Sequence, residues 1–163
     1  MLLAYEGRAH ALPFSFVRRL LVALSLAAAA ASAVAQAPAA RTIELGAGMY
    51  LIHAEVADSF ATRMQGLMHR TSLPPNGGML FVFDEEATPC MWMKNTLIPL
   101  SVAFLDASGA IINIADMQPH SEQSHCAARP SRYALEMTQG WFAQRGMHAG
   151  TRLRGLEKLP PPR

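Results

Sequence analysis

The chain lacks most of the short patterns that identify a reaction. It contains no phosphate-binding loop, no Gly-x-Gly-x-x-Gly fingerprint, no Gly-x-Ser-x-Gly nucleophile elbow and no His-Glu-x-x-His zinc motif. It also lacks the strand–helix alternation that builds a parallel, nucleotide-binding sheet. These absences leave no support in the sequence for nucleotide chemistry, for a serine hydrolase of that class or for a zinc peptidase. We therefore predict no cofactor.

Charged residues are also few, at 16% of the 163 residues, and neither sign dominates. Residues 1–35 hold three of the 14 basic residues and one of the 12 acidic residues, which leaves 11 of each in the rest of the chain. A nearly neutral domain with scattered charge has no basic surface of the kind that binds nucleic acid. We expect a small molecule or a protein as the partner, and no nucleic acid.

The first 35 residues have the organisation of a secretory signal peptide. Arg18 and Arg19 form a basic end, Leu20 to Ala31 is an apolar run interrupted only by Ser25, and residues 33–35 (Ala-Val-Ala) fit a signal peptidase site. The run is shorter than the roughly 20 strongly apolar residues that span a bilayer. We expect cleavage after residue 35, which predicts a periplasmic or secreted protein with no stable membrane anchor. An uncleaved N-terminal anchor is the alternative.

The rest of the chain predicts one mainly β domain over residues 42–157, between a flexible leader at 36–41 and a disordered tail at 158–163. About seven short strand-like segments and only one or two short helices indicate a small antiparallel barrel or sandwich. The predicted strands lie at 42–56, 79–83, 88–94, 100–105, 110–114, 133–137 and 151–156, and a short helix runs from Asp58 or Ser59 to Met64.

The segment from Cys90 to Leu100 contains three candidate binding residues. If it is extended, Trp92 and Lys94 share one face, and an indole beside an ammonium group can hold a planar or sugar-like ligand, with the lysine free for a carboxylate or phosphate. Asn95 follows directly. The alternative is that Trp92 fills the core, Lys94 extends to the core edge and Asn95 is a turn residue.

Glu136 is the second candidate, because it lies within an otherwise apolar strand. Such a carboxylate is either on the solvent face, or buried and paired with a cation such as Arg63 or Lys94. In the functional interpretation Glu136 is a general base whose pKa is raised by a pocket. No second carboxylate has a spacing that suggests paired acid–base chemistry.

The cysteines and histidines give weaker signals. His120, His125 and Cys126 are weak metal candidates, and eight of the ten methionines lie within residues 49–137, which hints at a soft ion such as copper. Their spacing fits no zinc or copper motif, and methionine is also a common core residue. Only Cys90 can pair with Cys126, so in an oxidising compartment either a bridge between them or a free Cys126 is possible.

Five segments of this chain resemble the bacterial and archaeal family called domain of unknown function 192. The resemblance covers about residues 43–156 and implies a compact, mainly β domain that is often exported and has no agreed activity. Two positions depart from the family pattern: Ser101 stands where members often have Asp, and Cys126 is alone where many have two cysteines. The segments are 63–68, 78–83, 92–100, 104–106 and 132–136.

Three functions are compatible with these observations. The first is a binding module for a small polar or anionic ligand, which predicts that Trp92, Lys94, Asn95, Arg63 and Glu136 converge in a concave site. The second is an envelope-directed hydrolase with Glu136 as base and Lys94 or Asn95 stabilising a developing negative charge. The third is an interaction or structural protein, which would be favoured if Trp92 and Glu136 were both fully buried with their polar groups satisfied.

Overall fold

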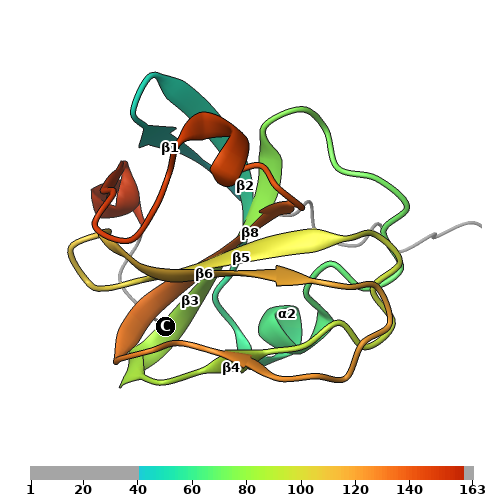
Figure 1. The fold of residues 1–163 in the computed structure, drawn as a ribbon. Coiled ribbons are helices and arrows are strands. Elements are labelled where there is room, and N and C mark those ends of the chain that lie inside the picture. The colour runs from blue at the N-terminus through green and yellow to red at the C-terminus, as the bar shows by residue number, and fades with distance from the viewer. Residues whose placement is uncertain (1–40, 160–163) are drawn as a thin grey trace, which may run out of the picture. The chain divides into compact units, whose positions relative to one another are not determined.

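A curled seven-stranded sheet organises residues 41–159, the part of the chain that the computed structural model describes (Figure 1). Its strand order is β6-β5-β8-β3-β2-β1-β9, and a separate two-stranded sheet pairs β4 with β7. The strands are β1 Thr42–Ala47, β2 Tyr50–Ala57, β3 Gly77–Ala87, β4 Cys90–Met91, β5 Leu100–Leu105, β6 Ile111–Met117, β7 His125–Cys126, β8 Ser131–Thr138 and β9 Leu153–Arg154. The predicted mainly β class is confirmed.

The helical elements are α2 Phe60–Gln65 and two short 3₁₀ helices, η1 Ala143–Arg145 and η2 Leu156–Lys158. Ser59 caps α2: its side chain accepts a hydrogen bond from the Thr62 backbone, and the Thr62 hydroxyl accepts one from the Ser59 backbone. This reciprocal pair satisfies two of the backbone donors that a helix start leaves free. Gly66 ends the helix with a positive φ, so the helix predicted from the sequence is confirmed.

One strand pair departs from the antiparallel arrangement that we predicted. β2 and β3 run parallel, whereas the other neighbouring strands of the large sheet are antiparallel. Parallel neighbours need a long crossover connection. Residues 58–76, which include α2, supply that crossover and carry the chain across one face of the sheet. Local patterning locates β2 and β3 but does not show which strands they pair with.

Both faces of the large sheet are covered, and β3 shows how its residues divide between them. Leu80 and Val82 belong to the hydrophobic core on one face, with β1, β9 and the segment around η1. Met79 and Phe81 belong to the core on the other face, together with the fully buried Met93. Because side chains alternate along a strand, each strand in the middle of the sheet contributes to both cores.

Several predicted strand boundaries were wrong. The strand expected over residues 42–56 is two strands, β1 and β2, separated by a turn at residues 48–49, and of the strand expected over residues 151–156 only Leu153–Arg154 forms. We expected a strand over residues 79–83, but β3 runs from Gly77 to Ala87, and its last residues are exposed and follow a register shift beyond Val82. This end of the strand extends past the core, so its polar side chains stay hydrated and incur no desolvation cost. We also expected a strand over residues 88–94, of which only Cys90–Met91 is paired, because the partner strand β7 is equally short.

The predicted hairpin over residues 100–114 is confirmed as β5 and β6. Its turn depends on Asp106, whose carboxylate accepts hydrogen bonds from the Ser108 and Ala110 backbone N–H groups, and on Gly109 with φ 79°. The expected signal peptide, most of the leader and the end of the tail lie outside the described residues. Within residues 41–159, no helix is both long and apolar enough to cross a bilayer.

Candidate functional site

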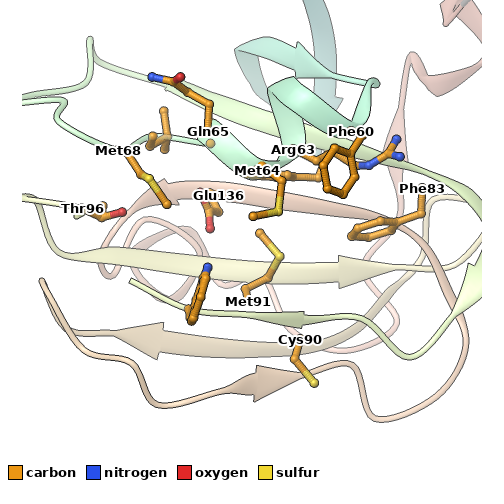
Figure 2. A pocket seen from close by; sticks show the side chains of 14 residues that line it. Phe60, Arg63, Met64, Gln65, Met68, Phe83, Cys90, Met91, Thr96 and Glu136 are labelled. Carbon is orange, nitrogen blue, oxygen red and sulfur yellow. The ribbon is translucent and has the colours of Figure 1, made fainter. Parts of the chain in front are cut away.

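A cavity of about 240 Å³ lies against the sheet face that α2 covers (Figure 2). We call it the α2 cavity. Its walls come from α2 and the turn after it, from β3, from β4 and the residues that follow, and from one residue of β8. Half of the 14 lining residues carry aromatic rings or thioethers, among them Phe60, Phe81, Phe83, Met64, Met68 and Met91.

Glu136 supplies the carboxyl group of the α2 cavity. It lies on β8, opposite Met79 of β3 and Val102 of β5, so both flanking strands bury it, and its exposed fraction is 4%. Figure 2 shows its oxygens directed into the cavity, between Met68 and Met64. Among residues 41–159, no group donates a hydrogen bond to this carboxyl, and burial raises the pKa of Glu136 to about 8.

Arg63 also lines the α2 cavity, but its guanidinium group is occupied. It donates hydrogen bonds to the backbone oxygens of Val82 (2.8 Å) and Asp58 (3.1 Å), and to both carboxylate oxygens of Asp84 (2.7 and 3.3 Å). The pairing of Glu136 with Arg63 or Lys94 that we considered does not occur within the described region. Arg63 instead ties α2 to β3, and Asp84 balances its charge.

The residues that follow β4 lie partly in the lining of the α2 cavity and partly outside it. Trp92 lines the α2 cavity and is 43% exposed. Lys94 is exposed and outside the lining, with its Nζ 5.4 Å from the centre of the Trp92 ring. Asn95 is also exposed, has φ 56°, and places its Nδ2 4.0 Å from the Met68 sulfur. Of the five residues proposed from the sequence, Arg63, Trp92 and Glu136 therefore share the cavity, whereas Lys94 and Asn95 lie beside it.

Three thioethers line the cavity that were not among the candidate site residues predicted from the sequence. Met64, Met68 and Met91 line the α2 cavity. Figure 2 shows Met64 and Met68 on one side of it and Met91 on the other. Phe60 and Met64 are four residues apart on one side of the helix, a spacing typical of a face that packs against the core. In the structure both are exposed, at 76% and 51%. The local signal was present, but periodicity alone does not distinguish a cavity rim from a core.

A disulfide holds one wall of the α2 cavity. Cys90 and Cys126 are directly opposite each other on β4 and β7 and are joined by a bridge, so neither thiol is free. Cys90, Met91 and Trp92 all line the cavity. The bridge therefore fastens the Trp92 segment to β7.

The candidate metal ligands do not gather into a site in the described region. His120 is exposed, His125 is opposite Met91 on the two-stranded sheet, and the Cys126 sulfur belongs to the disulfide. Within residues 41–159, no group of three or more His, Cys, Asp or Glu side chains is placed to hold a metal ion.

The chemistry that the α2 cavity offers follows from its lining. At neutral pH the Glu136 carboxyl is mostly protonated and can donate a hydrogen bond, and when ionised it can pair with a cation. Within the described residues, the lining contains no histidine, no free thiol and no second carboxyl. The cavity is thus a mostly apolar compartment in which Glu136 is the acidic group, and Gln65 and Thr96 add neutral polar side chains to the lining.

The chain belongs to the family called domain of unknown function 192. The family model, described as an uncharacterised group, matches residues 42–155. This agrees with the resemblance found in the sequence, and four of the five segments that carried it contribute residues to the α2 cavity: 63–68, 78–83, 92–100 and 132–136. No curated protein matches the chain.

Two crystal structures are similar to this fold. A protein of Sinorhizobium meliloti, described as a candidate transcription regulator, is 36% identical with a TM-score of 0.66; the match covers 70% of this chain and 92% of that one. A protein of unknown function from Novosphingobium aromaticivorans is 30% identical with a TM-score of 0.69, and here 77% and 94% of the two chains are covered.

Proposed function

We propose that this protein is a binding module for a small ligand and that the α2 cavity is its site. The observation that carries the proposal is the Glu136 carboxyl: the residue is only 4% exposed, its carboxyl reaches a mostly apolar cavity, and it has no hydrogen-bonding partner in the described residues. Burying a polar group without a partner is unfavourable. Ligand sites commonly combine apolar walls with a few such convergent polar groups, which a ligand then satisfies.

We predicted a small polar or anionic ligand, and the charges around the cavity favour a polar ligand over an anionic one. Arg63 is the cation in the lining, and its donors are bound to Asp84 and to backbone oxygens. Lys94 lies outside the lining. An anionic ligand would therefore meet a carboxyl group and no unengaged cation among the described residues. A ligand with one polar group and an apolar body fits this lining better.

The same site gives less support to the other two functions. A raised pKa suits a general acid or base, but the lining within the described region offers Glu136 no second carboxyl and no histidine to share the reaction. Trp92 is substantially exposed and Glu136 has no partner among residues 41–159, so the condition that would favour a purely structural role is not met. The exposed rim of Phe60, Met64 and Trp92 is the observation that favours a protein partner.

We also propose that the protein acts outside the cytoplasm, in the periplasm or after secretion. The signal-like organisation of residues 1–35 supports this location. The disulfide between Cys90 and Cys126 adds support, since such bridges persist in oxidising compartments and are rare in the cytosol.

A thermal-shift screen of alcohols, amines, carboxylates, sugars, nucleotides and metal ions tests the proposed site. A ligand at about 100 times its Kd stabilises the folded protein by about 2.7 kcal/mol, which moves the Tm by several degrees. We expect at least one compound to shift the wild type and not Glu136→Gln. Glu86→Gln, which changes an exposed glutamate of β3, is the matched control and should respond like the wild type. A response that Glu136→Gln retains in full would contradict the proposed site.

A further inference from the structure

We infer that the ligand of the α2 cavity is a small organic ammonium ion with an apolar body, held by the Glu136 carboxylate and the surrounding aromatic rings. This inference rests on the proposed binding function and narrows its ligand to one chemical class. The ligand is therefore a cation, whereas the sequence had led us to consider an anion. Three features of the cavity support the inference: the balance of charge, the nature of the walls and the position of Lys94.

When Glu136 is ionised, the charge of the cavity is unbalanced on the negative side. Asp84 neutralises Arg63 through a two-point ion pair, with Nη2 and Oδ2 2.7 Å apart. Glu136 has no corresponding cation within the described region. An isolated carboxylate in apolar surroundings is strongly unfavourable, and an opposite charge at hydrogen-bonding distance removes most of that cost. A ligand that carries an ammonium group supplies this charge, whereas a carboxylate ligand would add repulsion.

The walls of the cavity suit the rest of such a ligand. Phe81 is almost fully buried, Phe83 is half-buried, and Trp92 and Phe60 are exposed at the rim. Aromatic faces attract ammonium groups through the ring quadrupole, and this attraction grows when water is excluded. The same rings and the neighbouring thioethers bury alkyl carbon. The volume of about 240 Å³ is that of roughly eight water molecules in the liquid, enough for a short alkyl ammonium ion.

Substitution of Lys94 can distinguish a cationic ligand from an anionic one. Its ammonium group already lies 5.4 Å from the centre of the Trp92 ring, outside the cavity lining. The indole therefore accepts a cation on its solvent side. For a cationic ligand, removal of the Lys94 charge leaves binding unchanged or strengthens it. For an anionic ligand, the same change weakens binding.

Binding of an ammonium ion must depend on pH because it requires Glu136 in its ionised form. Of the ionisable side chains on the surrounding elements, only Arg63 and Glu136 line the cavity; Asp84 is bound to Arg63, Lys94 lies over Trp92, and His125 is opposite Met91 on β7. Below its pKa of about 8, Glu136 releases a proton when the ligand binds. The Kd should then fall about tenfold for each unit of rising pH and level off above pH 8.

Isothermal titration with three probes of matched chain length tests the inference: pentylammonium, pentanol and pentanoate, each at pH 6, 7, 8 and 9. The amine stays charged over this range because its pKa resembles that of lysine, about 10.4. At pH 9 we expect pentylammonium to bind at least tenfold more tightly than the other two probes. Glu136→Gln should lose at least tenfold, Glu86→Gln should match the wild type, and Lys94→Met should bind as well or better.

Each contrary result has a definite meaning. If pentanol or pentanoate binds most tightly and Glu136→Gln abolishes that binding, the ammonium inference is wrong and the proposed binding function stands. If none of the three probes binds to the wild type, and the screen described above is also flat, both fail. If silver(I) binds, Met64→Leu and Met68→Leu abolish this binding and pentylammonium does not bind, the cavity is a thioether metal site and the inference is overturned. Circular dichroism confirms that each variant is folded.

Discussion

Glu136 shows how one buried side chain can make the stability of a fold depend on pH. A glutamate between two strands, with aromatic and thioether groups above it, stays in the folded protein at neutral pH mostly by keeping its proton. A leucine or glutamine at this position would avoid the cost of ionisation altogether. We therefore regard the pH dependence of folding as a direct readout of this residue.

We expect the free energy of unfolding of the wild type to fall as pH rises from about 4.5 to about 8. Burial raises the pKa of Glu136 from 4.5 to about 8, so the folded state holds this proton more tightly than the unfolded state does. The stabilising contribution is therefore complete below the unfolded pKa and is lost as pH rises through the folded pKa. Urea unfolding at a series of pH values should give a slope of up to about 1.4 kcal/mol per pH unit.

Substitution of the same residue supplies the control. In Glu136→Gln this part of the slope should disappear, so that the variant gains stability relative to the wild type as pH rises toward 8. Glu86→Gln, on the exposed end of β3, should keep the slope of the wild type. An unchanged slope in Glu136→Gln would mean that this carboxyl is not the group that titrates.

The disulfide between β4 and β7 has its main effect on the wall of the cavity. These strands are only two residues long each, too short to hold together by backbone hydrogen bonds alone. The bridge closes a loop with a sequence separation of 36, for which loop-closure entropy gives a stabilisation of about 3–4 kcal/mol. It also fixes the backbone next to Trp92.

We expect the double variant Cys90→Ser/Cys126→Ser to remain folded near 20 °C and to lose about 3–4 kcal/mol of unfolding free energy. Because Trp92 follows β4 directly, its fluorescence should also become more sensitive to quenching by acrylamide. Chemical denaturation with and without a reductant measures the first effect. Reduced wild type should resemble the double variant, and equal stability of all forms would contradict the role given to the bridge.

Close packing between β3 and β8 depends on a glycine. Gly78 is opposite Met137, and a Cβ added to it would collide with the backbone oxygen of Glu136 and the sulfur of Met137. The strand that carries Glu136 therefore lies as close to β3 as it does only because this position has no side chain.

Gly78→Ala should lower the free energy of unfolding by about 2 kcal/mol or more, because β8 would have to move. Gly46→Ala is the matched control: it is also in a strand, and its nearest neighbour is the Arg154 side chain at 3.6 Å. We expect the control to change stability by less than about 1 kcal/mol. Thermal or urea unfolding of both variants measures the difference, and equal effects would show that β3 and β8 tolerate a larger separation.

The elements could be predicted from the sequence better than their arrangement. Alternating apolar residues located β2 and the β5–β6 hairpin, and Ser59 located the start of α2, because these signals are local. The parallel pairing of β2 with β3 was not visible, since it depends on how the crossover packs rather than on either strand. The extension of β3 to Ala87 was missed for a related reason, because its polar end projects beyond the core.

The candidate site was only partly predictable. Trp92, Arg63 and Glu136 stood out as unusual residues in apolar segments, and the fold brings them to one cavity. Lys94 follows Trp92 at a spacing that places both on one face only if the strand continues, and the strand ends at Met91. The occupation of Arg63 by Asp84 joins residues from α2 and β3, which no sequence spacing reveals.

The proposed export of the protein can be tested by determining its compartment and its N-terminal residue. Expression of residues 1–163 in a Gram-negative bacterium, followed by fractionation and intact-mass measurement, should give a periplasmic protein that begins at Gln36 and contains an oxidised Cys90–Cys126 pair. Recovery of the uncleaved chain from the cytoplasm with reduced cysteines would contradict the proposed export.

Direct titration of the Glu136 carboxyl by carbon-13 NMR is the most decisive measurement for the α2 cavity. In protein labelled at glutamate side chains, we expect one carboxyl resonance to titrate near pH 8, to be absent in Glu136→Gln, and to show a changed pKa when a ligand from the thermal-shift screen is bound. If every glutamate titrates in the ordinary range, or if a bound ligand leaves the Glu136 resonance unmoved, then this carboxyl is not the centre of a binding site.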